Sequence, residues 1–526
     1  MYAETAMEML AEVVKLRDDL RTGDLALNMF AADLYEVLMK RGEQPIYENP
    51  ETFFSLTYPT HSLRQLVRDV ALRLAGKNDK AVRQLELTYG GGKTHTLITL
   101  LHLMADPDSL PDLPAVNEFI SDIGQKPMKA VVAGLCFDKL DAETGMDVRG
   151  PDGSVRCLLH PWSVLAWQIA GAEGLKLLNA EGKEEERSTA PAENVLYQLL
   201  AIPGKNRLGV LILIDEVLMY AREKATLGVE WRGKIMDFFQ YLTQAAVKSK
   251  RCCIVASLLA SDPKKSDTLG RELQNDLYDI FQRQREQAIE PVAKEDVAEV
   301  LRRRFFTPDS IANKEEFKQH VIAALKGITM LDEQSSKDGA QTEQKFLNNF
   351  PFHPDLTEVL YGKWTNLDRF QRTRGVLRTF ALALREAEKW DQNPLIAWEI
   401  VNEEVKKQQR DGNVDPARAQ TLRINIDVAK GRIPESIRQA YCIVVTVSQQ
   451  NENQAFKINV SDEAHFTTIK NDKRARIQDS AITPEAVLPD GPYSLWTGNE
   501  KSRRVKDLSG AFAQMPRLPK MLLHVS

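Results

Sequence analysis

The sequence predicts an α/β fold built on a parallel sheet, joined to a helical region and a mixed α+β C-terminal region. Four short apolar runs are rich in β-branched residues, as expected for strands that are buried on both faces of a sheet. They are AVRQLELT (81–88), KAVVAGLCF (129–137), LGVLILID (208–215) and CCIVASLL (252–259). Helical segments separate them, and this alternation favours parallel strands joined by crossover helices.

Changes in pattern along the 526 residues divide the chain into four predicted domains. Residues 1–75 form an N-terminal helical segment, with a loop expected at 49–60 and a helix from about 62 to 74. The other three domains are the sheet-containing core (76–290), a mostly helical domain (291–412) and a mixed domain (413–526). In the mixed domain, residues 440–448 and 455–460 are predicted to pair as strands.

Composition and charge limit the classes of function. The net charge of −5 gives no global sign of nucleic-acid binding, although a local basic face is compatible with it. No run is long and apolar enough for a transmembrane helix, and the acidic N-terminus does not resemble a signal peptide. We therefore expect a cytoplasmic protein without membrane partners. The five cysteines lack Cys-x-x-Cys spacing and are expected to be buried, reduced thiols.

A glycine-rich turn joins the first predicted strand to a predicted helix in QLELTYGGGKTHTLITLLHL, residues 84–103. Glycines leave room for backbone N–H groups to face a phosphate, where a Cβ would obstruct the approach. The turn contains Gly90, Gly91 and Gly92. The N-terminus of the helix adds the positive end of its dipole. This arrangement predicts a phosphate-binding P loop.

The residues after the glycines have the side chains that an ATP site requires. Lys93 is expected to reach the β- and γ-phosphates, and the Thr94 hydroxyl is expected to hold Mg²⁺. The segment thus matches the Walker A pattern, except that Leu87 stands in place of its first glycine. His95 is also assigned to the nucleotide site, with packing or hydrogen bonding of the P-loop helix as the alternative.

The third apolar run ends in two acidic residues, in LGVLILIDEVLMYAR (208–222). Asp215 is expected to accept the water ligands of Mg²⁺, which makes it the second metal-site residue beside Thr94. Glu216 is expected to polarise the attacking water, because the nucleophile must lose a proton as the γ-phosphoryl group leaves. Lys93 and Asp215 lie far apart in sequence, so an insertion is expected between them at about 139–205.

The acidic end of the third apolar run, Asp215-Glu216, matches the Walker B pattern. Together the Walker A and Walker B motifs resemble those of AAA+ P-loop ATPases. The resemblance implies a polar residue at the tip of the next strand, near the γ-phosphate. Ser257 is the preferred candidate, and Ser261 is the other. Arg283 and Arg285 are candidates for an arginine finger that stabilises charge at a neighbouring subunit's nucleotide, with a solvated helix end as the alternative.

The mostly helical domain stands where the lid of AAA+ proteins follows the core. FQRTRGVLRTFALAL (370–384) places Gly375-x-x-Arg378 at a helix start, which resembles the sensor-2 signature of that lid. Arg378 is therefore expected to contact the γ-phosphate, and Arg372 and Arg374 are its rivals.

Upstream of the first strand, Tyr58 and Thr60 stand where AAA+ proteins often hold the adenine base. The resemblance implies base stacking and contact by these two residues. The alternative is that they pack the N-terminal helices on the sheet.

Beyond these motifs, seven segments resemble a large bacterial and archaeal group of P-loop ATPases filed as a domain of unknown function. They are FAADLYEVL (30–38), YENPETFFSLTYPT (47–60), TYGGGKTHTLITLLHL (88–103), LILIDEVLMYAR (211–222), FHPDLTEVLYGKW (352–364), FQRTRGVLR (370–378) and LPDGPYSLW (488–496). The Gly-Gly-Gly-Lys-Thr-His-Thr loop is the most specific part. The resemblance implies an association with DNA methyltransferases, helicases and nucleases in antiphage defence clusters, and members that are often longer than this chain.

We therefore expect an ATPase that uses ATP and Mg²⁺ to remodel DNA or a DNA-bound complex. A homo-oligomer is compatible with this function, because a finger arginine acts at the nucleotide of a neighbouring subunit. Two alternatives stay open. One is a switch that assembles on ATP and turns over slowly, and the other is a scaffold with a structural nucleotide site. Basic clusters within residues 470–476 and 501–506 are candidate DNA contacts, with a solvated face as the alternative.

Overall fold

The computed structural model describes most of the chain up to residue 313 and shorter segments beyond it. The described residues are 14–23, 25, 30–85, 92–217, 220–221, 229–257, 268–282, 289, 291–313, 315, 317–319, 321–322, 339–352, 354, 377, 380–382, 384–385, 443–446, 457–460, 489–490 and 494–495. The chain forms two compact units. One is Ala26–Arg304 with Gln371–Arg374, and the other is Met1–Leu25 with Phe305–Phe370 and Gly375–Ser526. The four predicted domain boundaries stay predictions.

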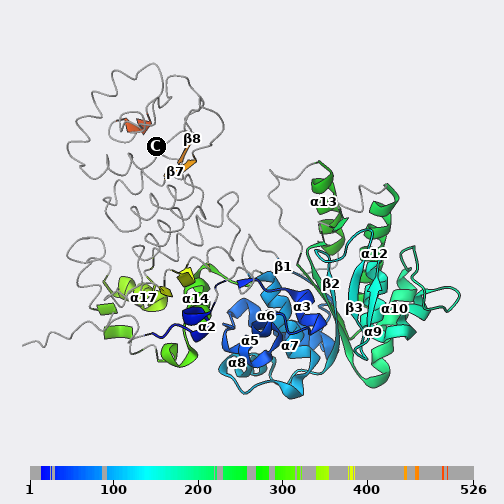
Figure 1. The fold of residues 1–526 in the computed structure, drawn as a ribbon, viewed down its shortest axis with the longest axis horizontal. Coiled ribbons are helices and arrows are strands. Elements are labelled where there is room, and N and C mark those ends of the chain that lie inside the picture. Colours follow the sequence, from blue (N-terminus) through cyan, green and yellow to red (C-terminus); the bar gives the residue numbers. More distant parts are fainter. Residues whose placement is uncertain are drawn as a thin grey trace, which may run out of the picture. The chain divides into compact units, whose positions relative to one another are not determined.

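A parallel sheet lies at the centre of the unit that contains Ala26–Arg304 (Figure 1). Within the described residues it has four strands, which follow the order β1-β6-β5-β2. Their bounds are Val82–Leu85 (β1), Cys252–Ser257 (β6), Gly209–Asp215 (β5) and Ala130–Cys136 (β2). The four predicted strands and their parallel orientation are thereby confirmed. Every residue of β5 and β6 is buried, as expected for strands inside a covered parallel sheet.

The strand order brings distant segments into one row at the carboxyl edge of the sheet. Leu85 pairs with Ser257, Ser257 pairs with Asp215, and Asp215 pairs with Cys136. On the outer side of β1, Ile289 forms a parallel bridge to Leu85. Strand β6 therefore lies between β1, which leads into the glycine-rich turn, and β5, which ends at Asp215.

Helices cover both faces of this sheet, and the side chains of the strands alternate between two apolar cores (Figure 1). Leu211 and Leu213 contribute to one core, and Val210, Ile212 and Ile214 contribute to the other. The first core includes side chains of α3 (Leu34–Met39), α4 (Pro45–Glu48), α5 (Pro50–Ser55), α6 (His61–Leu74), α7 (Lys93–Ala105) and α8 (Pro114–Ile123). The second includes side chains of α9 (Pro161–Leu178), α10 (Glu193–Ala201), α12 (Val229–Lys248) and α13 (Thr268–Gln282).

The connection from β2 to β5 covers residues 139–205, where an insertion was predicted, and the assignment as an insertion stays a prediction. It begins with an antiparallel hairpin of β3 (Met146–Arg149) and β4 (Val155–Leu158) and continues through α9 and α10 to the 3-10 turn η3 (Ile202–Asn206). Trp162 and Trp167 of α9 are buried in the core on this face. The remaining 3-10 turns of this unit are η2 (Pro107–Ser109) and η4 (Lys294–Asp296) within the described residues.

A loop was predicted for residues 49–60. This prediction is wrong for Pro50–Ser55, which form helix α5. The Asn49 side chain accepts hydrogen bonds from the N–H groups of Glu51 and Thr52, and Pro50 occupies the first turn. This is a common combination at a helix start, since the capping side chain satisfies N–H groups that lack partners and proline has no N–H to satisfy. The sequence Asn-Pro-Glu contains this signal.

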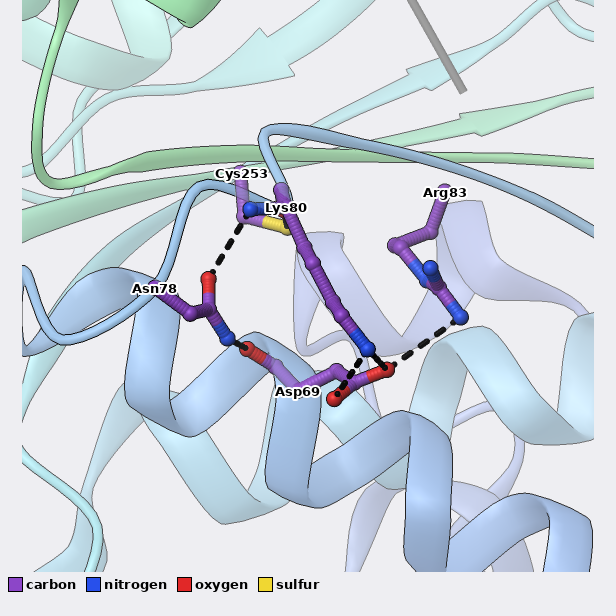
Figure 2. A network of polar contacts seen from close by, with 5 residues as sticks. All are labelled: Asp69, Asn78, Lys80, Arg83 and Cys253. Carbon is purple, nitrogen blue, oxygen red and sulfur yellow. Dashed lines mark hydrogen bonds and ion pairs between the residues drawn. The ribbon is translucent and has the colours of Figure 1, made fainter. Parts of the chain in front are cut away.

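Helix α6 confirms the helix predicted at residues 62–74, and a cluster of charges ties it to the amino end of β1 (Figure 2). The Asp69 carboxylate pairs with Lys80 Nζ at 3.0 Å and with an Arg83 guanidinium nitrogen at 3.2 Å. The side chains of Asp69 and Arg83 are 11% and 6% exposed, whereas that of Lys80 is 30% exposed. The pair between Asp69 and Arg83 is therefore almost completely withdrawn from water.

In the other unit, Leu16 forms an antiparallel bridge to Phe306, and the rings of Phe305, Phe352 and Phe380 pack together. Its elements include α2 (Asp18–Thr22), the last residue of α14 (Val297–Phe305), η5 (Pro308–Ile311), α17 (Gly339–Asn349), β9 (Pro489–Asp490) and β10 (Ser494–Leu495). Strands β7 (Ile443–Thr446) and β8 (Lys457–Val460) pair antiparallel, which confirms the strand pair predicted in the C-terminal region.

Candidate functional site

Two residues of the predicted metal site are in direct contact. Thr94, in the first turn of α7, donates a hydrogen bond from Oγ1 to Asp215 Oδ2 at 3.0 Å, although the two residues are 121 positions apart. Asp215 is the last residue of β5, and only 5% of it is exposed. The fold therefore joins the end of the glycine-rich turn to the acidic end of the third apolar run.

The Asp215 carboxyl group lies in an unusual electrostatic environment. Burial raises its pKa to about 7, and the neighbouring Glu216 carboxylate adds to the rise. The hydroxyls of Ser257 and Thr94 and the charge of Lys93 act in the opposite direction. Glu216, Ser257, Thr94 and Lys93 thus all influence the pKa of Asp215.

Two buried oxygens at the same place lie close enough for the Ser257 hydroxyl to lower the pKa of Asp215, but they do not form a hydrogen bond of regular geometry. Among the described residues, neither Asp215 Oδ1 nor Ser257 Oγ has a hydrogen-bond partner of regular geometry. Both residues are almost completely buried and are paired across the strands. A buried carboxylate oxygen without a partner is costly unless a cation or donor satisfies it. The oxygens of Thr94 and Asp215 are the hard ligands that Mg²⁺ prefers, so this pair fits the predicted metal.

Glu216 directly follows Asp215 and has a left-handed backbone with φ of 59°. This conformation costs about 1–2 kcal/mol for a residue other than glycine. Strained backbone of this kind is concentrated at functional sites, where the surrounding structure maintains it. Glu216 is half-buried and lies close enough to Asp215 to raise its pKa.

Gly92 is the one glycine of the predicted phosphate-binding turn that lies within the described residues. Gly92 has φ of 77°, a conformation that favours glycine, and it precedes the first residue of α7. Lys93 begins the helix and is partly buried. A Cβ added at Gly92 would lie 3.8 Å from Val292 Cγ2, so Val292 lies beside the turn. Val292 is a neighbour of the site that the sequence did not reveal, because no local pattern links positions 92 and 292.

His95, which the sequence assigned to the nucleotide site, makes its visible contacts with α5 and the residues after it. Its ring stacks on Phe53 with centroids 4.4 Å apart, and its Nε2 lies 3.0 Å from Thr57 Oγ1. Burial lowers the pKa of His95 well below its ordinary value, and the charge of Arg304 lowers it further. These contacts match the packing alternative. The i, i+4 spacing of Phe53 and Thr57 was the signal that could have identified them.

Tyr58 and Thr60 are the residues predicted to contact the adenine base. Thr60 contacts Pro291, the residue before Val292, which lies beside Gly92. Thr60 caps α6 by accepting from Leu63 N at 3.1 Å, and it donates a short hydrogen bond to Pro291 O. The Thr60 hydroxyl therefore already donates one hydrogen bond and accepts another within the protein. Tyr58 is partly exposed, and burial together with the nearby Glu299 and Asp296 carboxylates raises its pKa.

Several predicted residues lie outside the described part of the chain. They are Gly90, Gly91, Ser261, Arg283, Arg285, Arg372, Arg374, Gly375 and Arg378, together with the basic clusters within 470–476 and 501–506. Their assignments as phosphate loop, sensor, finger or DNA contact stay predictions.

Two expectations about the whole chain can be compared with the described residues. Cys136, Cys252 and Cys253 are buried free thiols, as expected, whereas Cys157 is exposed, so the prediction of burial is wrong for that residue. Cys157 lies in β4 of the two-stranded hairpin, where its thiol donates a hydrogen bond to Thr144 O at 3.3 Å.

No described helix has both the length and the apolar character needed to cross a bilayer.

Comparison with known proteins gives two matches, both to domains of unknown function. Residues 9–136 match the family description DUF499 N-terminal domain, and residues 292–408 match DUF499 second domain. No curated protein and no solved structure matches the chain. The first match ends at the last residue of β2, and the second begins at Val292, the residue beside Gly92. Over these two segments the chain is similar to DUF499 proteins.

Proposed function

We propose that this chain binds ATP with Mg²⁺ at the carboxyl edge of its parallel sheet and hydrolyses it as an AAA+-like ATPase. The observation that carries the proposal is the hydrogen bond from Thr94 to Asp215. Two motifs predicted independently of each other, one for phosphate and one for Mg²⁺, meet at the position where open α/β sheets bind their ligands. The parallel strands bring both motifs to one edge of the sheet, and the hydrogen bond places the Thr94 hydroxyl directly on the Asp215 carboxylate there.

Each residue of the site has a role in this proposal. Thr94 and Asp215 hold Mg²⁺, which when bound with ATP neutralises charge on the phosphates. Lys93 neutralises phosphate charge from the start of α7, and the dipole of that helix assists it. Glu216 accepts the proton of the attacking water. The Ser257 hydroxyl, at the end of β6 between β1 and β5, donates to a phosphate oxygen or to the water.

The presence of Glu216 supports hydrolysis over a purely structural nucleotide site. A structural site has no need of a carboxylate that can take a proton from water. The left-handed backbone of Glu216 is compatible with a role at this position, although Lys40 and Arg207 at helix ends have the same conformation.

We further propose that the ATPase acts on DNA or on a DNA-bound complex in a bacterial antiphage defence or DNA modification system, alongside methyltransferase, helicase or nuclease partners. Support for this comes from the resemblance of the seven segments described above and not from a contact in the structure. Stimulation of turnover by double-stranded DNA is the corresponding measurement.

The test of the proposed function is hydrolysis of Mg²⁺-ATP by the wild type and by Glu216→Gln. We expect the variant to bind ATP with little change and to lose turnover roughly 100-fold, because loss of a general base commonly has an effect of this size or larger. Phosphate release measures turnover, and calorimetry measures binding. Ser163→Ala, at a buried serine of α9 far along the chain from both motifs, is the control and should retain turnover.

The outcomes separate the candidate functions. Turnover in the wild type that is lost in Glu216→Gln supports the ATPase. Tight ATP binding without turnover in either protein, with or without DNA, overturns the enzyme for this chain and favours a switch that assembles on ATP. Failure of the wild type to bind Mg²⁺-ATP overturns the nucleotide site itself.

A further inference from the structure

Two histidines of α7, His95 and His102, lie on the same side of the helix and both contact Phe53 of α5. The centroid of the Phe53 ring lies 4.4 Å from that of the His95 ring and 5.1 Å from that of the His102 ring. Seven residues, or two helical turns, separate them. His95 lies directly after Lys93 and Thr94, whereas His102 lies in the last turn of the helix.

The hydrogen bonds around His95 fix which of its nitrogens carries the proton. Thr57 Oγ1 donates its one hydrogen to Phe53 O at 2.8 Å. It must therefore act as the acceptor in its 3.0 Å contact with His95 Nε2, so that Nε2–H is the donor. Among the described residues the other ring nitrogen, Nδ1, is buried and has no hydrogen-bond partner. The imidazole is thus neutral and held in one orientation.

The platform that receives His95 is itself rigid. Phe53 and Thr57 are each 1% exposed. Tyr47 packs against Phe53, and its carbonyl oxygen accepts a hydrogen bond from His102 Nε2 at 2.8 Å. From α14, Arg304 donates to the Tyr47 hydroxyl at 3.1 Å and lies over the Tyr47 ring, 5.5 Å from its centroid. Buried rings and satisfied hydrogen bonds leave this group little freedom to move.

We propose that His95 is a positioning residue for the ATPase reaction, which acts by holding the first turn of α7 against Thr57 and Phe53. This inference rests on the proposed function. Lys93 and Thr94 are the two preceding residues in that turn, so a rotation or shift of the turn moves both side chains relative to Asp215. A small displacement of such groups affects the reaction rate far more than it affects folding, since phosphoryl transfer depends chiefly on positioning.

The test compares variants of His95 with a matched variant of His102. His95→Phe keeps the stacked ring but removes the donor to Thr57, and it should lower kcat roughly 10- to 100-fold with a smaller change in KM. His95→Gln supplies an amide N–H of similar reach and should keep kcat within about threefold of wild type. His102→Phe also loses one buried hydrogen bond and should keep kcat within about twofold, with a similar decrease in melting temperature.

Thr57→Val removes the same hydrogen bond from the other side and should reproduce the loss of kcat if His95→Phe does not fold. Equal kcat values for His95→Phe and His102→Phe at similar melting temperatures would show a structural role only, and would overturn the positioning role while leaving the ATPase intact. A wild type that neither binds nor hydrolyses Mg²⁺-ATP overturns the proposed function, and the positioning role fails with it.

Discussion

Asp215→Asn is expected to make the ligand-free protein more stable at pH 8 by up to about 4 kcal/mol, while it abolishes stabilisation by Mg²⁺-ATP. The ordinary pKa of an aspartate is about 3.9, and each unit of difference between folded and unfolded states corresponds to about 1.4 kcal/mol. Burial and Glu216 raise the pKa of Asp215 to about 7. Asparagine has nearly the same shape and still accepts the hydrogen bond from Thr94, but it has no charge to bury.

The effect should depend on pH in a defined direction. Below about pH 4, Asp215 is protonated in both the folded and the unfolded protein, so the substitution changes little. Between about pH 4 and its raised pKa of about 7, the folded protein holds a proton that the unfolded chain releases, and the stability of the wild type falls as the pH rises. Above that range the carboxylate is ionised in both states, and the stability difference between variant and wild type is largest.

Urea denaturation of both proteins at pH 5 and pH 8, followed by tryptophan fluorescence, measures this difference. The same experiment with saturating Mg²⁺-ATP should reverse the order, because only the wild type gains stability from the ligand. Asp138→Asn is the control, since that side chain is 39% exposed on the same edge of the sheet and should change stability by less than about 0.5 kcal/mol. A stability gain of equal size at both pH values would contradict the raised pKa of Asp215.

The sequence predicted the strands of the sheet and both ends of its candidate site. Runs such as LGVLILID are apolar at every position because β5 is covered on both faces, and this property can be read locally. The glycine-rich turn before Lys93 and the acidic end of β5 were likewise recognisable from short patterns. Their meeting through Thr94 and Asp215 follows once the strands are parallel, since the carboxyl ends of parallel strands share one edge.

The arrangement between these elements could not be predicted in the same way. The position of β6 between β1 and β5 depends on contacts between segments far apart in the chain, for which a single sequence has no signal. His95 was assigned to the nucleotide because of its place in the loop, whereas its partners Phe53 and Thr57 come from a segment that was expected to be a loop. The carboxylate of Asp69 was missed entirely, because a charged residue in an amphipathic helix ordinarily faces water.

Asp69→Ala is expected to destabilise the protein by about 3–5 kcal/mol, because it removes one partner of the nearly buried ion pair between Asp69 and Arg83 (Figure 2). Removing one partner of a buried pair costs far more than the pair contributes, since the remaining charge is withdrawn from water and loses a carboxylate that stabilised it. Arg83 lies in β1, where all four residues are buried, and cannot turn out to solvent without disrupting the strand that precedes the glycine-rich turn. Urea denaturation at constant pH measures the loss.

Two further variants distinguish this explanation from a general loss of packing at the amino end of β1. Lys80→Ala removes the other cation that pairs with Asp69, but its side chain is 30% exposed, so a loss of no more than about 1 kcal/mol is expected. Asp69→Leu combined with Arg83→Met replaces the buried pair by apolar side chains and should recover most of the stability lost in Asp69→Ala. Recovery would identify the loss of the Asp69 carboxylate beside the buried Arg83 charge as the cause, whereas a double variant as unstable as Asp69→Ala would mean that α6 and β1 need the ion pair itself to dock.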